Sequence, residues 1–134
     1  MHCCLTGNGM YRIGFLGIIL LAAIGCGPSR PSSAGGKPVE YWLEKVHDKE
    51  DSERIEAVKK LGNIGKQSPK ALPAIVNALS DPIPSVRKVG IYAVVRNWPA
   101  SRIALPRLEE MKEKDEDADI REIAEEAYGN LKRK

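Results

Sequence analysis

Apolar residues from position 39 onward recur with a period of roughly 33–34 residues, a length typical of stacked helical units. Three stretches share one pattern, counted from the residue directly before an arginine. In each stretch, the residues four and eight positions later are small or apolar. The arginines are Arg54, Arg87 and Arg121, so the stretches begin at nearly equal intervals. Offsets of four and eight lie on one face of an α-helix, so each stretch predicts an amphipathic helix.

A second set of apolar stretches alternates with the first at the same period. These stretches begin at Val39, Leu72 and Leu105. Pro73 and Pro106 recur at the repeat interval near the start of two of them, where a missing N–H costs little. The two sets together predict six helices, at residues 39–47, 52–64, 69–80, 85–97, 102–113 and 118–132.

Serine and proline mark several of the expected helix boundaries. Ser68 precedes Pro69, which predicts an N-cap followed by proline at the first helical position. Pro99 forces a break after the fourth helix, and Ser101 is a candidate cap for the fifth.

Each repeat also carries an aspartate six positions before its arginine. The pairs are Asp48 with Arg54, Asp81 with Arg87, and Asp115 with Arg121. In these features residues 39–134 resemble the HEAT repeat family, including its short bacterial forms. The resemblance implies an all-α fold, a short α-solenoid of about three helical hairpins, in which the six residues form a buried or half-buried ladder that joins successive units. An arginine fork can satisfy turn carbonyls and a carboxylate together, so we interpret these residues as structural.

Two positions depart from the pattern of that family. Gly90 and Glu125 stand where alanine is usual. Glu125 predicts that the last helix is a cap whose outer face meets water, as terminal repeats require.

The residues before the repeat predict export and anchoring. Residues 13–24 are uncharged and apolar, follow Arg12, and are too few for a permanent membrane span. The sequence Ala23-Ile24-Gly25-Cys26 resembles a bacterial lipoprotein signal, which implies cleavage after residue 25 and a lipid on Cys26. We therefore expect a signal peptide at 1–25 and a membrane-anchored lipoprotein of the cell envelope, facing the periplasm or the exterior. A plain signal peptide and an uncleaved anchor are the alternatives, and Met10 is an alternative start.

The segment between the anchor and the repeat is rich in Gly, Ser and Pro. Residues 26–38 hold almost no apolar bulk, so they cannot offset the entropy of ordering. The expectation is a flexible linker that carries the lipidated cysteine and keeps the 39–134 domain close to the membrane.

Charge is distributed in blocks along the domain. Residues 40–56 hold seven acids and three bases, 59–107 hold nine bases and one acid, and 109–126 hold ten acids and three bases. Such blocks influence association more than fold. They either neutralise one another across helix contacts or mark a surface for a charged partner.

The domain shows no pattern that indicates catalysis or a cofactor. It lacks cysteine, its one histidine is isolated, and no phosphate-binding or zinc spacing is present, so we expect no enzyme, no metal and no cofactor. Trp42 occupies a position that predicts burial. Trp98 lies in a turn where we expect it to cover a gap between helices, with an exposed binding anchor as the alternative.

We therefore expect the function to be binding to a protein partner. In HEAT solenoids the second helix of each unit lines the concave side, and we assign the polar candidates to those helices. The candidates are Lys70, Asn77, Arg102 and Arg107, three of which belong to the basic block and favour an acidic protein segment. A lyase-related repeat unit and a basic surface that binds an anionic ligand are the alternatives. Nucleic acid is not expected, because the acidic blocks would repel phosphates.

Overall fold

The structure, a computed structural model, describes residues 33–133. The expected signal peptide, Met10 and Cys26 lie outside the described residues. The elements in chain order are β1 (Ser33–Ala34), β2 (Lys37–Pro38), α1 (Val39–Lys45), α2 (Asp51–Ile64), α3 (Ala71–Asn77), η1 (Ala78–Ser80), α4 (Pro84–Arg96), η2 (Ala100–Ala104), α5 (Leu105–Lys114) and α6 (Ala118–Lys132). The six expected helices are present, which confirms the all-α solenoid.

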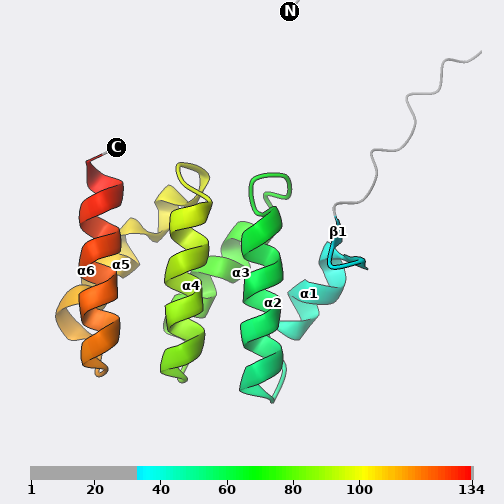
Figure 1. Cartoon of the computed structure of the whole chain (residues 1–134), viewed down its shortest axis with the longest axis horizontal. Coiled ribbons are helices and arrows are strands. Elements are labelled where there is room, and N and C mark those ends of the chain that lie inside the picture. The colour runs from blue at the N-terminus through cyan, green and yellow to red at the C-terminus, as the bar shows by residue number, and fades with distance from the viewer. Residues whose placement is uncertain (1–32, 134) are drawn as a thin grey trace, which may run out of the picture.

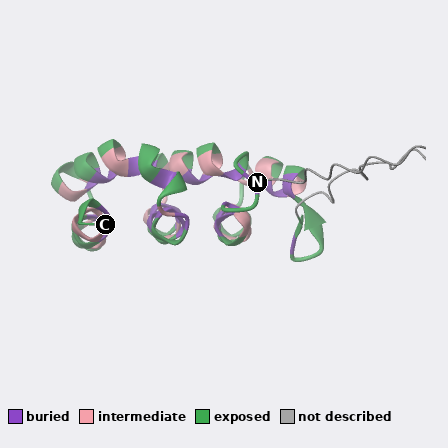
Figure 2. Cartoon of the chain, turned by 90° about the horizontal axis from the view of Figure 1, so that it is seen from above, coloured by how far each residue is buried: buried purple, intermediate pink, exposed green. Residues whose placement is uncertain are grey.

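The helices form two layers. Figure 1 shows α2, α4 and α6 side by side in one row, with α1, α3 and α5 behind them. Seen from above in Figure 2, the buried sides of the two rows face each other, so the core lies between the layers. The chain alternates between rows, so consecutive helices pair into three hairpins: α1 with α2, α3 with α4, and α5 with α6.

Helix α4 shows how the sequence pattern builds this core. Its buried residues include Val86, Ile91 and Val94, which recur on one face. Gly90 lies on that face, and a Cβ there would come within 3.2 Å of Leu79 Cδ2. Glycine replaces the usual alanine because the preceding turn packs so closely against α4.

The two expected serine caps are not found. Helix α3 begins at Ala71, its N-cap position is Lys70, and Ser68 lies in the turn before it with its carbonyl accepting from the Ala71 N–H at 2.9 Å. Ser101 lies fully buried inside η2, and its hydroxyl donates to the Val94 carbonyl at 2.6 Å. The hydroxyl therefore satisfies the end of α4 rather than the start of α5.

The end of the expected flexible linker is also ordered. Residues 33–38 form a small antiparallel hairpin, with Gly35 and Gly36 in the left-handed region at φ of 56° and 75°. The indole N–H of Trp42 donates to the Ala34 carbonyl at 2.8 Å, and both side chains are buried. The expectation of a flexible linker is therefore wrong for residues 33–38, because Trp42 gives a segment of low apolar content one buried attachment. The burial expected for Trp42 is confirmed.

We expect Trp42→Phe to loosen this hairpin. The change leaves the buried Ala34 carbonyl without its donor, which costs about 1–3 kcal/mol. Amide hydrogen exchange of residues 33–37 should therefore accelerate at least about fivefold, since RT is about 0.6 kcal/mol. Tyr41→Phe is the matched control, since it removes a neighbouring hydroxyl that makes no hydrogen bond within residues 33–133. Equal exchange in the two variants would contradict the anchoring role of the indole.

The opposite end of the stack is closed by polar side chains. The Tyr128 hydroxyl donates to Glu109 at 2.8 Å, and the ammonium groups of Lys112 and Lys132 lie 5.0 and 5.3 Å from its ring centre. Glu125 is exposed on α6. The exposed Glu125 agrees with the expectation that the outer face of α6 meets water. The β-hairpin of residues 33–38 lies at the other end of the stack.

Trp98 is half-buried and packs against the core, in the turn after α4. Its indole contributes apolar surface to that turn. Among residues 33–133, no helix combines the length and the apolar character needed to cross a bilayer.

Candidate functional site: the arginine ladder and the exposed rows

Arg54 connects the first and second hairpins. Its Nε and Nη2 donate to the two carboxylate oxygens of Asp81 at 2.9 and 3.1 Å. Its Nη1 donates to the carbonyls of Asp48 and Lys49 in its own turn, at 3.0 and 3.1 Å. One guanidinium therefore closes a local turn and binds the next unit.

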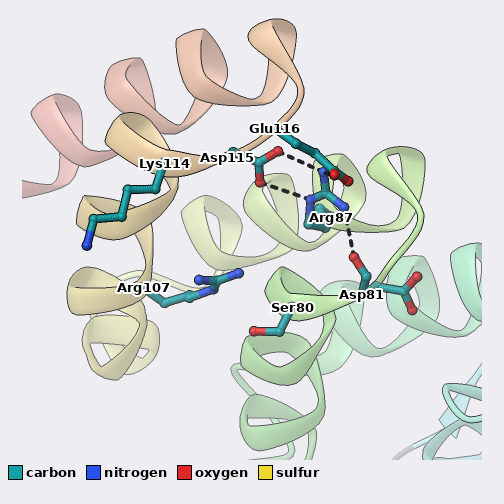
Figure 3. A pocket seen from close by; sticks show the side chains of 7 residues that line it. All are labelled: Ser80, Asp81, Arg87, Arg107, Lys114, Asp115 and Glu116. Atoms are coloured by element: carbon teal, nitrogen blue, oxygen red, sulfur yellow. Dashed lines mark hydrogen bonds and ion pairs between the residues drawn. The ribbon is translucent and has the colours of Figure 1, made fainter.

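Arg87 repeats this geometry one unit further along. Its Nε and Nη2 donate to the carboxylate of Asp115 at 3.0 and 2.7 Å (Figure 3). Its Nη1 donates to the carbonyls of Asp81 and Pro82 at 2.9 and 3.1 Å. The side chains of Arg87 and Asp115 are only 5% and 4% exposed. This rung is buried, and each of the three guanidinium nitrogens donates a hydrogen bond.

The ladder ends at both termini of the stack. Asp48 pairs with Lys45 at 2.8 Å rather than with an arginine. Arg121 donates from Nη1 to the carbonyls of Asp115 and Glu116, at 2.6 and 3.3 Å, and pairs with no carboxylate among residues 33–133. The aspartate six positions before each arginine thus supplies a backbone carbonyl, while the ion pair crosses to the aspartate of the following unit.

The ladder also sets the ionisation of Asp81. Burial by itself raises the pKa of this carboxyl, but hydrogen bonds from Arg54 and from the Ile83 N–H outweigh it, and the net pKa is lowered. Arg54 has its own pKa raised, chiefly by the hydrogen bond to Asp81. At the N-terminal end the hydrogen bond from Lys45 lowers the pKa of Asp48.

We expect acid to weaken the ladder at Asp81. Because the folded pKa lies below the unfolded value of about 4, the stabilising contribution is complete above that value and is lost as the pH falls through the folded pKa. The difference in melting temperature between wild type and Asp81→Asn should therefore be constant from about pH 7 to 5 and shrink below about pH 4. Glu44→Gln, at an exposed acid outside the ladder, should show no comparable difference at pH 7. A pH-independent difference for Asp81→Asn would contradict the ionic origin of the effect.

A polar hollow of about 270 Å³ lies beside the second rung. Its walls hold three acids, three bases and a serine, namely Asp81, Asp115, Glu116, Arg87, Arg107, Lys114 and Ser80 (Figure 3). Arg107 is engaged with Glu110 at 2.6 Å and with the Leu79 carbonyl at 3.3 Å. The hollow is balanced in charge, and its two most buried side chains, Arg87 and Asp115, form the second rung of the ladder.

The four residues expected to contact a partner lie in or beside the elements that precede α4 and α6 along the chain. Lys70 precedes α3 and lies 3.7 Å from Glu40, Asn77 ends α3, Arg102 lies in η2, and Arg107 lies in α5. Lys70, Asn77 and Arg102 are exposed. The first described helix is α1, so these residues belong to the helices that come first in each hairpin. Their assignment to the second helices is wrong; the second helices are α2, α4 and α6.

Comparison with protein families identifies the repeat. The family model described as HEAT repeats matches residues 39–129, from the start of α1 into α6. The chain belongs to the HEAT repeat family. The HEAT match begins with α1, which agrees with the pairing of α1 with α2. A comparison with curated proteins finds no match.

Sequence reasoning missed the exposed face of α4. Tyr92 is 53% and Val95 38% exposed in the middle of the HEAT stack. Aligning the repeats on their arginines puts Tyr92 at the position of Lys59 and Glu126. This alignment could have revealed the exposed face from sequence, because a large aromatic residue stands where the other two repeats have charged, solvent-facing residues. Within residues 33–133 no group of three or more metal-binding side chains is assembled.

Proposed function

We propose that this HEAT repeat chain is a non-catalytic protein-interaction module, tethered to the bacterial cell envelope by a lipid on Cys26. The observation that carries the module is the ladder. Two bidentate rungs hold three hairpins in one arrangement, so the surfaces of both rows are formed before a partner arrives. A preformed surface avoids much of the ordering cost of binding, and repeat solenoids use such extended surfaces.

The tether is supported by the order of segments along the chain. An uncharged apolar run at 13–24 is followed closely by Cys26, and the first strand that the structure describes begins at Ser33. Only a short stretch of chain therefore separates Cys26 from the hairpin. So few residues reach at most about 25 Å even when fully extended, so a lipid on Cys26 would keep the module beside the membrane.

The tether is tested by lipid labelling of the full chain in a bacterial host. The wild-type chain should incorporate radiolabelled palmitate and sediment with membranes. Cys26→Ala should lose the label, whereas a Cys3→Ala, Cys4→Ala double variant should keep it. An unlabelled wild-type chain, or a labelled Cys26→Ala chain, would refute the lipid anchor.

The module is tested by crosslinking of the full chain in membranes of its native host. A protein partner should be captured in a saturable manner, and capture should fall when the stack is destabilised by Arg87→Met. Absence of any saturable protein capture would refute the interaction function, irrespective of the tether.

A further inference from the structure

We propose that the face of α2 and α4 binds an acidic protein segment that carries aliphatic side chains. In this arrangement Lys59 and Arg96 hold carboxylates of the segment, and Tyr92 packs against an aliphatic residue. The inference rests on the proposed interaction function and specifies the surface and the chemistry of its ligand.

Tyr92 is the centre of this surface. It lines two hollows, one against α2 and one against α6, and half of its side chain is exposed. Val95 is the next exposed apolar residue of α4 and lines the second hollow. Figure 1 shows α4 in the middle of the front row, between α2 and α6, so a segment that crosses this row passes over α4. Large aromatic residues at the centre of a surface are frequent energetic anchors of interfaces.

The hollow between α2 and α4 suits side chains of a peptide. Its volume is about 290 Å³, at the lower limit of small-molecule sites. The two helices approach closely beside it: a Cβ on Gly62 would lie 2.9 Å from the Ala93 Cβ. Gly62 and Ala93 line the hollow, and their side-chain hydrogen and methyl group are too small to fill it. Lys59, Tyr92 and Arg96 bound this open space.

The charge of this hollow selects the ligand. Lys59 and Arg96 are exposed and line it, and no carboxylate within residues 33–133 does. Neither side chain makes an ion pair in that part of the chain, whereas Arg54, Arg87 and Arg107 are all engaged. Two exposed cations that make no ion pair within residues 33–133 can attract carboxylates of a partner.

The second hollow limits how far the acidic part of the ligand extends. It has a volume of about 130 Å³, lies between α4 and α6, and combines Ile91, Val95 and Ile123 with one acid, Glu126. A carboxylate is disfavoured beside Glu126, and an aliphatic side chain is favoured there. The ligand therefore places acids over α2 and apolar residues over α4 and α6. A nucleic acid strand fits this pattern poorly, because its phosphates continue toward Glu126.

The test uses the full chain in mild detergent and a fluorescent peptide of four glutamates around two leucines. Binding is followed by anisotropy. We expect Tyr92→Ala to weaken binding at least about tenfold, as for a central aromatic anchor. The double variant Lys59→Glu, Arg96→Glu should weaken it by a similar factor, and high salt should weaken wild-type binding. Peptides with lysines for the glutamates, or serines for the leucines, should bind at least tenfold more weakly.

A matched variant distinguishes the two rows. Lys70→Glu combined with Arg102→Glu reverses two exposed cations on the back row and should leave peptide binding unchanged. Loss of binding in this variant with retention in Lys59→Glu, Arg96→Glu would overturn the inference and place the ligand on the back row. Absence of any peptide binding would also overturn it, while partner capture in native membranes would still stand as an independent test of the module. Thermal melts confirm that each variant is folded.

Discussion

Arg87→Met is expected to lower the free energy of unfolding by about 3–5 kcal/mol, because it leaves a buried charge without its partner. The carboxylate of Asp115 is 4% exposed and takes two hydrogen bonds from this guanidinium. The carbonyls of Asp81 and Pro82 lose their donor as well. Urea unfolding followed by circular dichroism measures the loss.

Two companion variants isolate the buried pair. Arg121→Met removes the equivalent side chain at the end of the ladder, where no carboxylate within residues 33–133 is paired with it, and should cost about 1 kcal/mol or less. Combining Arg87→Met with Asp115→Leu should recover much of the loss, since replacing both members of a buried pair with apolar residues is often neutral. Similar losses for Arg87→Met and Arg121→Met would show that the ion pair across units is not what joins the hairpins.

Ile91→Ala is expected to lower the free energy of unfolding by about 2–5 kcal/mol, because it leaves a cavity in the core. Ile91 is fully buried on α4, which packs against both α2 and α6. Its loss therefore weakens the middle of the stack, where neighbouring hairpins depend on α4. Thermal and urea unfolding of the full chain in detergent measure this change.

Tyr92→Ala is the control at the next position. Tyr92 is 53% exposed and makes no hydrogen bond through its hydroxyl within residues 33–133, so its removal should change stability by only about 0.5 kcal/mol. A large loss of stability in Tyr92→Ala would mean that this side chain serves the fold and would weaken its assignment to binding. A large loss of stability in Ile91→Ala and a small one in Tyr92→Ala would show that Ile91 serves the core and that Tyr92 lies on the outward face of α4.

The repeat itself could be predicted from local sequence. Apolar offsets of four and eight, prolines at the repeat interval and arginines at matching positions depend on helix geometry and turn chemistry within each unit. These are short-range effects, so they are visible without knowledge of the stack. The burial of Trp42 followed from the same alignment. The departures at Gly90 and Glu125 were visible as well, although only the structure shows the close approach that explains Gly90.

The partners of the ladder were decided by tertiary structure. The sequence shows an aspartate six positions before each arginine but does not show which carboxylate each guanidinium reaches. Arg54 binds Asp81 and Arg87 binds Asp115, 27 and 28 residues later. Which carboxylate a guanidinium reaches depends on how successive hairpins are offset when they stack. No periodicity along the chain records that offset.

The exposed surfaces were decided in the same way. The sequence indicated polar and basic candidates and assigned them to the second helices, whereas they lie in or beside the first helix of a hairpin. The order of helices within a hairpin depends on how the helices pair in the stack. The composition argument did not predict the hairpin at 33–38, which is attached by the indole hydrogen bond of Trp42 and by the burial of Ala34. By itself the sequence determined six helices and a three-unit repeat; tertiary packing decided which charges pair within residues 33–133 and that Tyr92 lies between two hollows. The physical reason is that helix formation depends on neighbours within about four residues, whereas ion pairs and surfaces depend on the spacing between layers.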